Sequence, residues 1–468
     1  LVTKSHQSNQ IALYAAEKLR YNYDRHHLKS EGKQMDYKQN QMSNEDRMKW
    51  FTEAKLGIFI HWGIYSVLGV GESWSFFKGE ISYEDYMKQL DGFTAANYNP
   101  DAWAELFEKA GAKYVVLTTK HHDGVALWDT KASHLNVVEK TPAGRDLIRP
   151  YCAALCAHNM KVGLYFSHLD WSHPDYASIR PKSDDWWSNS PFNTPPKGQP
   201  DDIKRWNRYL QFHKAQLTEL LTNFGTVDLL WFDGVWERTP ELWHFKEMND
   251  YIRSLNPEII INSRIGGYGD YKTPEQAMPV SAPDGIWEFC VTLNDSWGYQ
   301  PQDHNYKSLH QLIRIFTECI GMGGNLLLDI GPKADGSIDE RAQELLLGLG
   351  EWIHRNSEAV YQTERGLPLG LFFGNSTVSN DRKKLFLFYY DLPSGPIALK
   401  GVRNKIKRIS VLGHDASLTF AVNGGFERMP GIVWIDVPQT LCDPHCTVLQ
   451  VEPEGELDLY TGQGGGIK

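Results

Sequence analysis

The sequence predicts an α/β fold, a (β/α)8-like, TIM-type barrel followed by a C-terminal antiparallel β-sandwich. Two observations predict the barrel: short apolar runs recur along the first 365 residues, and helical patterns fall between several of them. A third predicts the sandwich, because the helical patterns disappear beyond residue 365 and short strands follow one another. An open doubly wound sheet is the alternative to a barrel, but no glycine-rich dinucleotide fingerprint follows a strand.

The barrel strands are predicted from runs that are apolar throughout rather than alternating. Such runs are typical of strands buried on both faces, as in a parallel sheet. They cover residues 57–63, 114–120, 161–167, 227–233, 258–264, 285–291 and 325–331. Helices are predicted over residues 99–112, 147–159, 206–225 and 306–323.

Composition changes along the chain predict four segments. Ser43 and Asp46 have the spacing of a capping box, so a helix is expected to begin there. Beyond the barrel, Gly, Pro, Asn and Asp separate the short strands, and the last residues are rich in glycine. The predicted segments are an N-terminal arm or helix at 1–42, the catalytic barrel at 43–365, the sandwich at 366–458 and a flexible tail at 459–468.

The charge balance excludes some partners. A net charge of −10 argues against nucleic acid and anionic membrane surfaces, because both bind basic faces. No apolar run reaches the roughly 20 residues of a membrane span. The sequence begins without Met, and we expect that a signal peptide is absent from it because it was removed.

The six cysteines leave the redox compartment open. Cys152 and Cys156 lie in an apolar helical pattern and are expected to be buried free thiols. Cys442 and Cys446 flank a short loop that could hold a small disulfide or a metal site, although two thiols and one histidine are few for zinc.

Aromatic residues are unusually frequent, at 16 Trp, 22 Tyr and 20 Phe, and many stand beside acids, amides, histidines or arginines. Flat apolar rings next to hydrogen-bonding groups suit ligands that have both kinds of surface, above all sugars. A core rich in tryptophan is the alternative interpretation.

Ionisable and aromatic residues also gather where the predicted strands end. Catalytic groups of a parallel barrel lie at the carboxyl ends of its strands, so these side chains are expected to share one pocket. The residues are His61, His121, His122, Tyr165, Trp231, Asp233 and Arg264, together with Glu288 in the run 285–291.

Two of these residues suggest the chemistry. Asp233 is followed by Gly234, which would let the backbone turn away and leave the carboxylate facing the barrel mouth. Glu288 lies in an apolar run beside Trp287, where poor solvation favours the protonated form. One ionised and one protonated carboxyl group are the pair that glycoside hydrolysis requires.

Other chemistries have less support. His121, His122 and Asp123 could be metal ligands, but successive strand residues point to opposite faces, so hydrogen bonds to sugar hydroxyls are favoured. Arg264 suits vicinal hydroxyls or a ring oxygen, or else an ion pair with a nearby acid. No nucleophile-elbow motif is present. We predict no metal and no cofactor.

Taken in order, several motifs resemble those of glycoside hydrolase family 29, the retaining α-L-fucosidases. The similarity covers roughly residues 45–365. The motifs are WFTEAKLGIFIHWGIYS, YVVLTTKHHDGVALWDT, VGLYFSHLDW, LLWFDG, WEFCVTLNDSWGY and GGNLLLDIGPKADG. Each is weak alone, but six in sequence order are highly specific.

The resemblance implies a function and a set of roles. It implies an exo-acting α-L-fucosidase that hydrolyses terminal α-L-fucosyl residues from glycans with retention of configuration. Asp233 resembles the nucleophile, and Phe59 resembles the aromatic that meets the C5 methyl group. The residues similar to the fucose-contacting set are His61, His121, His122, Tyr165, Trp231 and Arg264.

The resemblance leaves two candidates for the acid/base. They are Glu288 and Glu72, and we favour Glu288, with Glu72 as a ligand of sugar hydroxyls. Relatives often have Trp directly after this glutamate, whereas here Ser73 stands between Glu72 and Trp74, the expected stacking residue.

Two alternative functions come from the same residues. One is a hydrolase of another sugar such as galactose, and the other is an inactive, lectin-like carbohydrate binder. The expected partners are fucosylated oligosaccharides or glycoconjugates, with no nucleic acid, no membrane span and an oligomeric state that the sequence does not define. Glycan hydrolysis fits a periplasmic or secreted protein, or a lysosomal one in a eukaryote.

Overall fold

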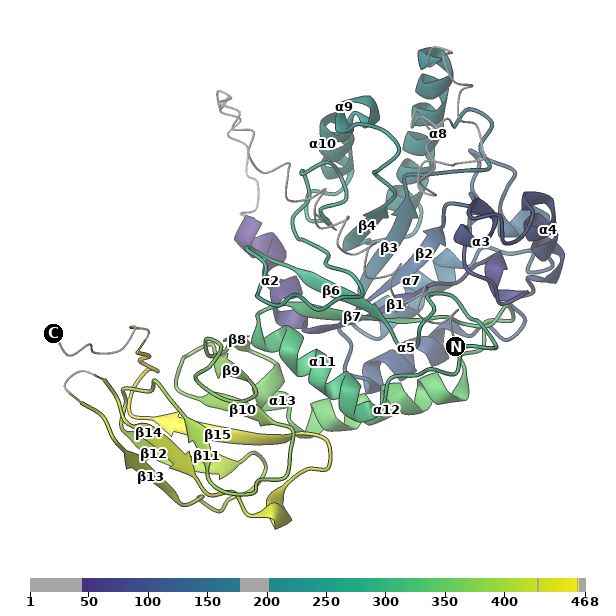
Figure 1. Ribbon diagram of the computed structural model, residues 1–468. Helices are drawn as coiled ribbons and strands as arrows, with labels where there is room; N and C mark the ends of the chain where they lie inside the picture. Colours follow the sequence, from purple (N-terminus) through teal and green to yellow (C-terminus); the bar gives the residue numbers. More distant parts are fainter. Residues whose placement is uncertain (1–43, 177–201, 427–428, 461, 463–468) are drawn as a thin grey trace, which may run out of the picture. The chain divides into compact units, whose positions relative to one another are not determined.

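The computed structural model describes residues 44–176, 202–426, 429–460 and 462 (Figure 1). The predicted N-terminal arm at 1–42 lies outside the described residues, as does most of the predicted tail. The first part of the described chain is built on seven parallel strands in the order β5-β4-β3-β2-β1-β7-β6. Their bounds are Leu56–Ile60 (β1), Tyr114–Lys120 (β2), Lys161–Ser167 (β3), Leu229–Asp233 (β4), Ile260–Ile261 (β5), Glu288–Thr292 (β6) and Asn325–Ile330 (β7).

An irregular segment, residues 271–276, stands where an eighth strand would be. On one side Asn262, directly after β5, forms a parallel bridge with Tyr271, and on the other side Glu275 forms one with Cys290 of β6. The curled sheet with this segment matches the predicted (β/α)8-like barrel. The predicted strand 258–264 is only two residues long, and the predicted strand 285–291 begins three residues later than expected.

The predicted helices are all present. They are α5 (Pro100–Lys109), α7 (Ile148–Ala157), α8 (Ile203–Thr222) and α11 (Leu309–Gly321), and the structure adds α10 (Phe245–Leu255) and α12 (Glu340–Arg355). Amphipathic patterns form these helices because their apolar faces cover the strands. Helix α2 (Asn44–Ala54) begins within the capping sequence that predicted it.

The inward-facing residues of the strands form their own core. Phe59, Tyr165 and Trp231 belong to it, and α2 contributes Phe51, whose ring centroid lies 5.5 Å from that of Tyr114. Gly57 makes room for this packing, because a Cβ atom there would lie 2.3 Å from the Tyr114 ring. The barrel interior is therefore filled with side chains, and α2 packs on it.

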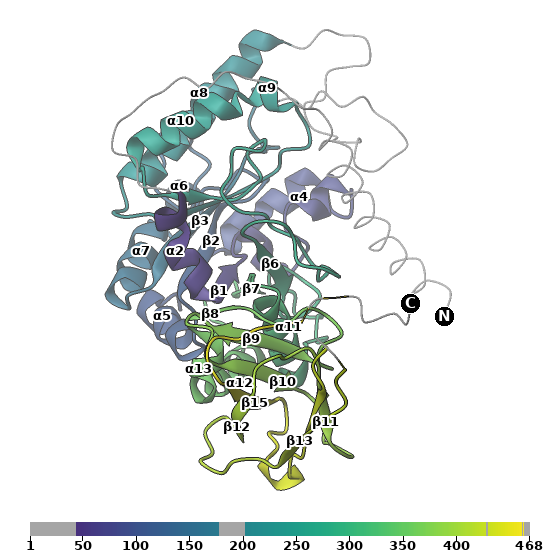
Figure 2. The ribbon, with the colours of Figure 1, turned by 90° about the vertical axis from the view of Figure 1, so that its left-hand side faces the viewer.

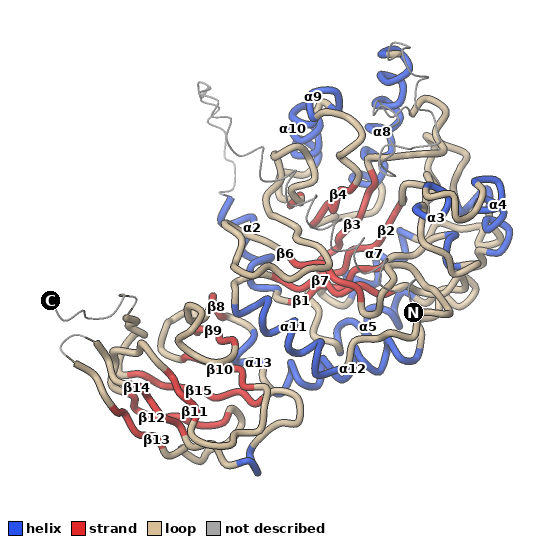
Figure 3. Tube along the Cα trace, viewed as in Figure 1, coloured by secondary structure: helices blue, strands red, loops and turns tan. Residues whose placement is uncertain are grey.

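The C-terminal part is the predicted β-sandwich. It has a five-stranded sheet, β12-β15-β10-β9-β8, and a three-stranded sheet, β11-β14-β13, drawn in red in Figure 3. Both sheets contribute to one core, for example through Leu385, Leu449 and Val433. The strands are β8 (Thr363–Arg365), β9 (Asn375–Ser379), β10 (Leu385–Tyr389), β11 (Ile397–Leu399), β12 (Ile406–Val411), β13 (Phe420–Asn423), β14 (Ile432–Ile435) and β15 (Thr447–Pro453).

The first sandwich strand lies before the predicted boundary at residue 366, because β8 pairs with β9. Helices α11, α12 and α13 (Ser357–Val360) lie between the parallel strands and this sheet (Figures 1 and 2). On the sandwich side, Trp352 of α12 donates a hydrogen bond from Nε1 to the Cys446 carbonyl, 3.0 Å away.

All six cysteines are free thiols, so Cys442 and Cys446 do not form the disulfide considered above. Cys152 is buried as expected, whereas Cys156 is exposed. None of the helices in the described ranges is long and apolar enough to cross a membrane.

Candidate active site

The pocket is built around Asp233, the last residue of β4. Gly234 follows with a φ of +84°, and a Cβ atom there would lie 2.5 Å from the Leu169 side chain. A left-handed conformation in a crowded position requires glycine, so the turn predicted at Gly234 is confirmed. The Asp233 side chain keeps 14% of its surface exposed, which leaves it accessible from the barrel mouth.

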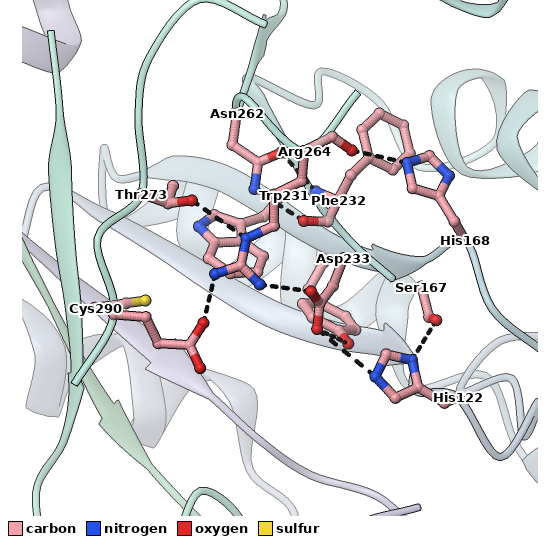
Figure 4. A network of polar contacts seen from close by, with 12 residues as sticks. His122, Ser167, His168, Trp231, Phe232, Asp233, Asn262, Arg264, Thr273 and Cys290 are labelled. Atoms are coloured by element: carbon pink, nitrogen blue, oxygen red, sulfur yellow. Dashed lines mark hydrogen bonds and ion pairs between the residues drawn. The ribbon is translucent and has the colours of Figure 1, made fainter. Parts of the chain in front are cut away.

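A single arginine holds Asp233 and a second carboxylate. Arg264 donates from Nη1 to Asp233 Oδ1 and from Nη2 to Glu275 Oε2, both at 2.5 Å. Its guanidinium carbon lies 4.4 Å above the centre of the Trp231 ring. Figure 4 shows Asp233 between Arg264 and His122. Arg264 therefore pairs with nearby acids, which was one of its two predicted roles.

Sequence reasoning missed Glu275. It lies on the irregular segment 271–276, and its side chain is 18% exposed. The sequence of this segment is not a continuous apolar run, so it was not predicted to be a strand. The rule that catalytic groups lie at the carboxyl ends of strands therefore did not apply to it. The available signal was chemical, because an arginine in an apolar pocket requires acidic partners.

Glu288 has a different place from the predicted one. It is the first residue of β6, at the amino end of the strand, and it is fully buried. Tyr114 donates to its Oε2 at 2.5 Å and Trp231 Nε1 donates to its Oε1 at 2.9 Å. Burial raises the pKa of Glu288 to about 7, as its apolar surroundings predicted.

The expectation that Glu288 lies at the pocket end of its strand is wrong. Trp231 carries Arg264 over its face, whereas its indole N–H donates to Glu288 at the edge of the ring. The strand begins at Glu288 and not before it, which places the carboxyl group deep in the barrel interior.

The second acid/base candidate, Glu72, is also buried. Its Oε1 accepts a hydrogen bond from the Gly298 backbone at 2.6 Å, and burial raises its pKa. Trp74 begins the short helix α3 (Trp74–Phe77), and its ring packs edge-on against His122, 5.4 Å away. The intervening Ser73 lies 2.6 Å from His121 Nδ1, so the extra residue supports a pocket histidine.

The three predicted histidines are close together and each has a partner at Nδ1. The partners of His61, His121 and His122 are Asp329 at 2.6 Å, Ser73 at 2.6 Å and Ser167 at 2.5 Å. Burial lowers the pKa of His61 to about 3 and that of His122 to about 4, so both are neutral near pH 7. Neutral imidazoles leave Nε2 for other hydrogen bonds.

Neighbouring histidines share the pocket because β2 ends at Lys120, so strand alternation no longer applies to His121 and His122. Their ring centroids lie 4.2 Å apart, whereas the Asp123 carboxylate accepts a hydrogen bond from Tyr86 instead. Among the described residues, no group of three or more His, Cys, Asp or Glu side chains is arranged to hold a metal ion.

Aromatic rings form the rest of the pocket. Tyr165 donates from its hydroxyl to Asp233 Oδ2 at 3.2 Å. Phe59 lies 4.9 Å from Trp231 and 4.5 Å from His61, measured between ring centroids. Trp297, which sequence reasoning did not single out, lies 4.9 Å from His61 and adds a further apolar ring.

Paired carboxylates, neutral hydrogen-bonding side chains and apolar rings at the mouth of a barrel define a glycoside hydrolase. The family model described as alpha-L-fucosidase matches residues 25–358. The chain belongs to this family, glycoside hydrolase family 29, as the sequence motifs predicted.

Individual proteins similar to this chain agree with the family assignment. The chain is 34% identical to tissue alpha-L-fucosidase of Mus musculus over 349 residues, which are 67% of this chain and 71% of the relative. Alpha-L-fucosidase isoenzyme 1 from Paenibacillus thiaminolyticus superposes with a TM-score of 0.79, at 36% identity over 88% of this chain and 99% of that one. A trapped covalent intermediate of a GH29 alpha-L-fucosidase from Bacteroides thetaiotaomicron superposes at 0.75, with 25% identity over 91% and 98%.

Proposed function

We propose that the protein is an exo-acting α-L-fucosidase that removes terminal α-L-fucosyl residues from glycans by retaining double displacement. One observation carries the proposal: Arg264 bridges Asp233 and Glu275 in the pocket. Carboxyl groups of retaining glycosidases are about 5–5.5 Å apart, a separation that one guanidinium can span. The expected substrates are fucosylated oligosaccharides or glycoconjugates, and the proposed location is periplasmic, secreted or lysosomal.

Asp233 is the proposed nucleophile. Its carboxylate attacks the anomeric carbon and the bond to the leaving oxygen breaks, which produces a covalent fucosyl-enzyme. Hydrogen bonds from Arg264 and Tyr165 favour the ionised carboxylate and orient it. The trapped covalent intermediate of the Bacteroides relative supports this step.

Glu275 is the proposed acid/base, in place of Glu288. It protonates the leaving oxygen, and it then takes a proton from the water that releases fucose. Glu275 is partly exposed and shares Arg264 with the nucleophile, whereas Glu288 is fully buried and accepts a hydrogen bond from the indole edge of Trp231. Glu72 stays a ligand of sugar hydroxyls.

The remaining pocket residues are proposed to recognise the sugar. Neutral imidazoles of His61, His121 and His122 bind hydroxyl groups, Trp74 and Trp231 pack on the ring, and Phe59 with Trp297 faces the C5 methyl group. A methyl group in place of a hydroxymethyl favours an apolar wall, since a buried hydroxyl there would lack a partner.

The substrate test compares hydrolysis of nitrophenyl α-L-fucoside and nitrophenyl β-D-galactoside, two sugars with similar hydroxyl stereochemistry. We expect turnover of the fucoside, with the α anomer as first product by NMR. Preference for the galactoside would identify another glycosidase, and fucose binding without any turnover would identify a lectin-like protein.

The residue test combines variants with leaving groups. Asp233→Ala should lower kcat about 10⁴-fold, and azide should restore turnover as a fucosyl azide of inverted configuration. Glu275→Ala should spare dinitrophenyl fucoside but lower kcat/KM for natural linkages about 10²- to 10⁴-fold. Glu288→Gln is the matched control, because Glu288 is a carboxyl group that accepts a hydrogen bond from Trp231, the ring on which Arg264 packs. If Glu288→Gln or Glu72→Ala shows the leaving-group dependence and Glu275→Ala does not, the acid/base assignment is wrong.

A further inference from the structure

The hydrogen bonds of Ser167 define the proton position on His122. Ser167 is the last residue of β3 and is fully buried. Its hydroxyl donates to the Leu169 carbonyl at 2.8 Å, and its Oγ lies 2.5 Å from His122 Nδ1 (Figure 4). A serine hydroxyl has one proton. Because that proton is given to Leu169, Ser167 must accept the second hydrogen bond, and His122 must carry its proton on Nδ1.

The other nitrogen of His122, Nε2, then carries a lone pair and lies near Asp233. His122 is fully buried, and its Nε2 has no hydrogen-bond partner among the described residues. Nε2 lies 3.7 Å from Asp233 Oδ2, beyond hydrogen-bond distance. The imidazole is neutral above about pH 4, so this approach is not an ion pair. A buried acceptor without a donor is costly unless a ligand supplies the donor.

We infer that Ser167 is a positioning residue that holds His122 as the Nδ1–H tautomer, so that Nε2 accepts a hydrogen bond from the substrate. The inference rests on the proposed function of the same pocket. Asp233 is placed to contact the anomeric carbon, and an atom 3.7 Å from its carboxylate oxygen can reach the hydroxyl on the adjacent ring carbon. Hydrogen bonds to this 2-hydroxyl strengthen in the transition state of glycosidases.

The alternative tautomer would work against catalysis. An Nε2–H group would direct its proton toward Asp233, which already accepts hydrogen bonds from Arg264 and Tyr165. It would also meet the 2-hydroxyl as a donor rather than an acceptor. The bond from Ser167 to Leu169 prevents this, because it removes the proton that Ser167 would otherwise donate to Nδ1.

The assignment is specific to His122. The Nδ1 partner of His61 is the carboxyl group of Asp329, which burial holds at a raised pKa. A carboxyl group donates or accepts according to its own proton, so it does not define the tautomer of His61. Only a hydroxyl group that already donates its proton to another acceptor defines the tautomer of the histidine beside it.

The test measures the same variant on two substrates, one with the 2-hydroxyl group and one without it. Ser167→Ala removes the acceptor at Nδ1, and we expect kcat/KM for nitrophenyl α-L-fucoside to fall about 10- to 100-fold. For the 2-deoxy fucoside the same variant should lose less than about threefold, because the contact that Ser167 supports is absent there. Thr119→Val is the matched control, since Thr119 is fully buried on β2 and donates to the Tyr165 carbonyl at 2.6 Å.

Equal losses of Ser167→Ala on both substrates would overturn the inference, as would a selective loss in Thr119→Val. A second measurement does not depend on turnover. ¹⁵N spectra report which imidazole nitrogen carries the proton, and the His122 signal can be assigned by its loss in a His122→Gln variant. In wild type, Nδ1 of His122 should be protonated. In Ser167→Ala, Nδ1 should no longer be the protonated nitrogen. If the enzyme hydrolyses no fucoside but this change is seen, the proposed function fails while the tautomer assignment stands. An Nε2-protonated His122 in wild type would overturn the assignment itself.

Discussion

At the scale of single residues, the pocket separates three carboxyl groups by their surroundings. Asp233 and Glu275 each accept a hydrogen bond from Arg264 and stay partly exposed in the pocket. Glu288 has only the neutral donors Tyr114 and Trp231, so burial keeps a proton on it in the acidic range. A carboxyl group in an apolar run is therefore not sufficient evidence for an acid catalyst, because burial alone produces the same signal.

The raised pKa of Glu288 predicts how stability depends on pH. The folded protein keeps the proton up to about pH 7, whereas the unfolded chain releases it near the ordinary glutamate pKa of 4.5, so the free energy of unfolding falls as pH rises through this window. The loss approaches about 3 kcal/mol, at about 1.4 kcal/mol per pH unit. Glu288→Gln should not show it.

Urea unfolding at several pH values between 5 and 8 measures this dependence. The stability of Glu288→Gln relative to wild type should increase with pH up to about pH 7 and then level off. A difference that stays constant from pH 5 to 8 would contradict the raised pKa of Glu288.

At the scale of elements, the two ends of the barrel have separate roles. The carboxyl ends of the strands carry the pocket, and α2 contributes apolar side chains to the interior core. Beyond the end of β5, the Asn262 side chain continues the pairing with β4. Its Oδ1 accepts from the Phe232 N–H, and its Nδ2 donates to the Phe232 carbonyl. The segment 271–276 continues from there and carries Glu275 toward Arg264.

Helix α2 is expected to stabilise the barrel without affecting catalysis. Phe51 is fully buried, and its ring lies 4.5 Å from Tyr271. Phe51→Ala should lower the free energy of unfolding by about 3–5 kcal/mol. At a temperature where the variant is folded, kcat/KM should change less than about threefold. Glu53→Ala, an exposed change on the same helix, should stay within about 0.5 kcal/mol of wild type in thermal unfolding. Equal effects of the two changes would contradict this role.

At the scale of the described chain, the barrel and the sandwich share apolar packing. Trp352 of α12 and Phe388 of β10 belong to the same buried cluster, as do Cys446 and Val448. The ring centroids of Trp352 and Phe388 lie 6.1 Å apart. Separate cores would let the two parts unfold independently, whereas a shared one couples them.

Calorimetry should therefore show one unfolding transition for the two parts. Trp352→Ala should lower its midpoint by removing about 3–5 kcal/mol of packing and the bond to Cys446. Leu347→Ala is the control, since Leu347 lies on the same helix with 39% of its surface exposed. Two resolved transitions in wild type would show that the shared cluster does not couple the barrel and the sandwich.

Much of the molecule follows from local sequence. The continuous apolar runs of the first 365 residues contain the buried parallel strands, and the residues that end those runs are brought to one rim, so His61, His121, His122, Asp233 and Arg264 could be grouped in advance. The helices follow from amphipathic patterns and caps. Six ordered motifs then identified the family, because a specific pocket needs the same residue types in the same order along the strands.

Tertiary pairing decided the rest. Segment 271–276 has no periodicity of its own, and its bonds to Asn262 and β6 place Glu275 beside Arg264. Strand β6 begins at Glu288 because of its pairing with β7, so an apparently catalytic glutamate lies inside the barrel. The sequence by itself determined the barrel, the sandwich, the family and most pocket residues. Only the tertiary structure decided which carboxyl group shares Arg264 with Asp233 and which groups bond His122, since both depend on contacts between residues far apart in the chain.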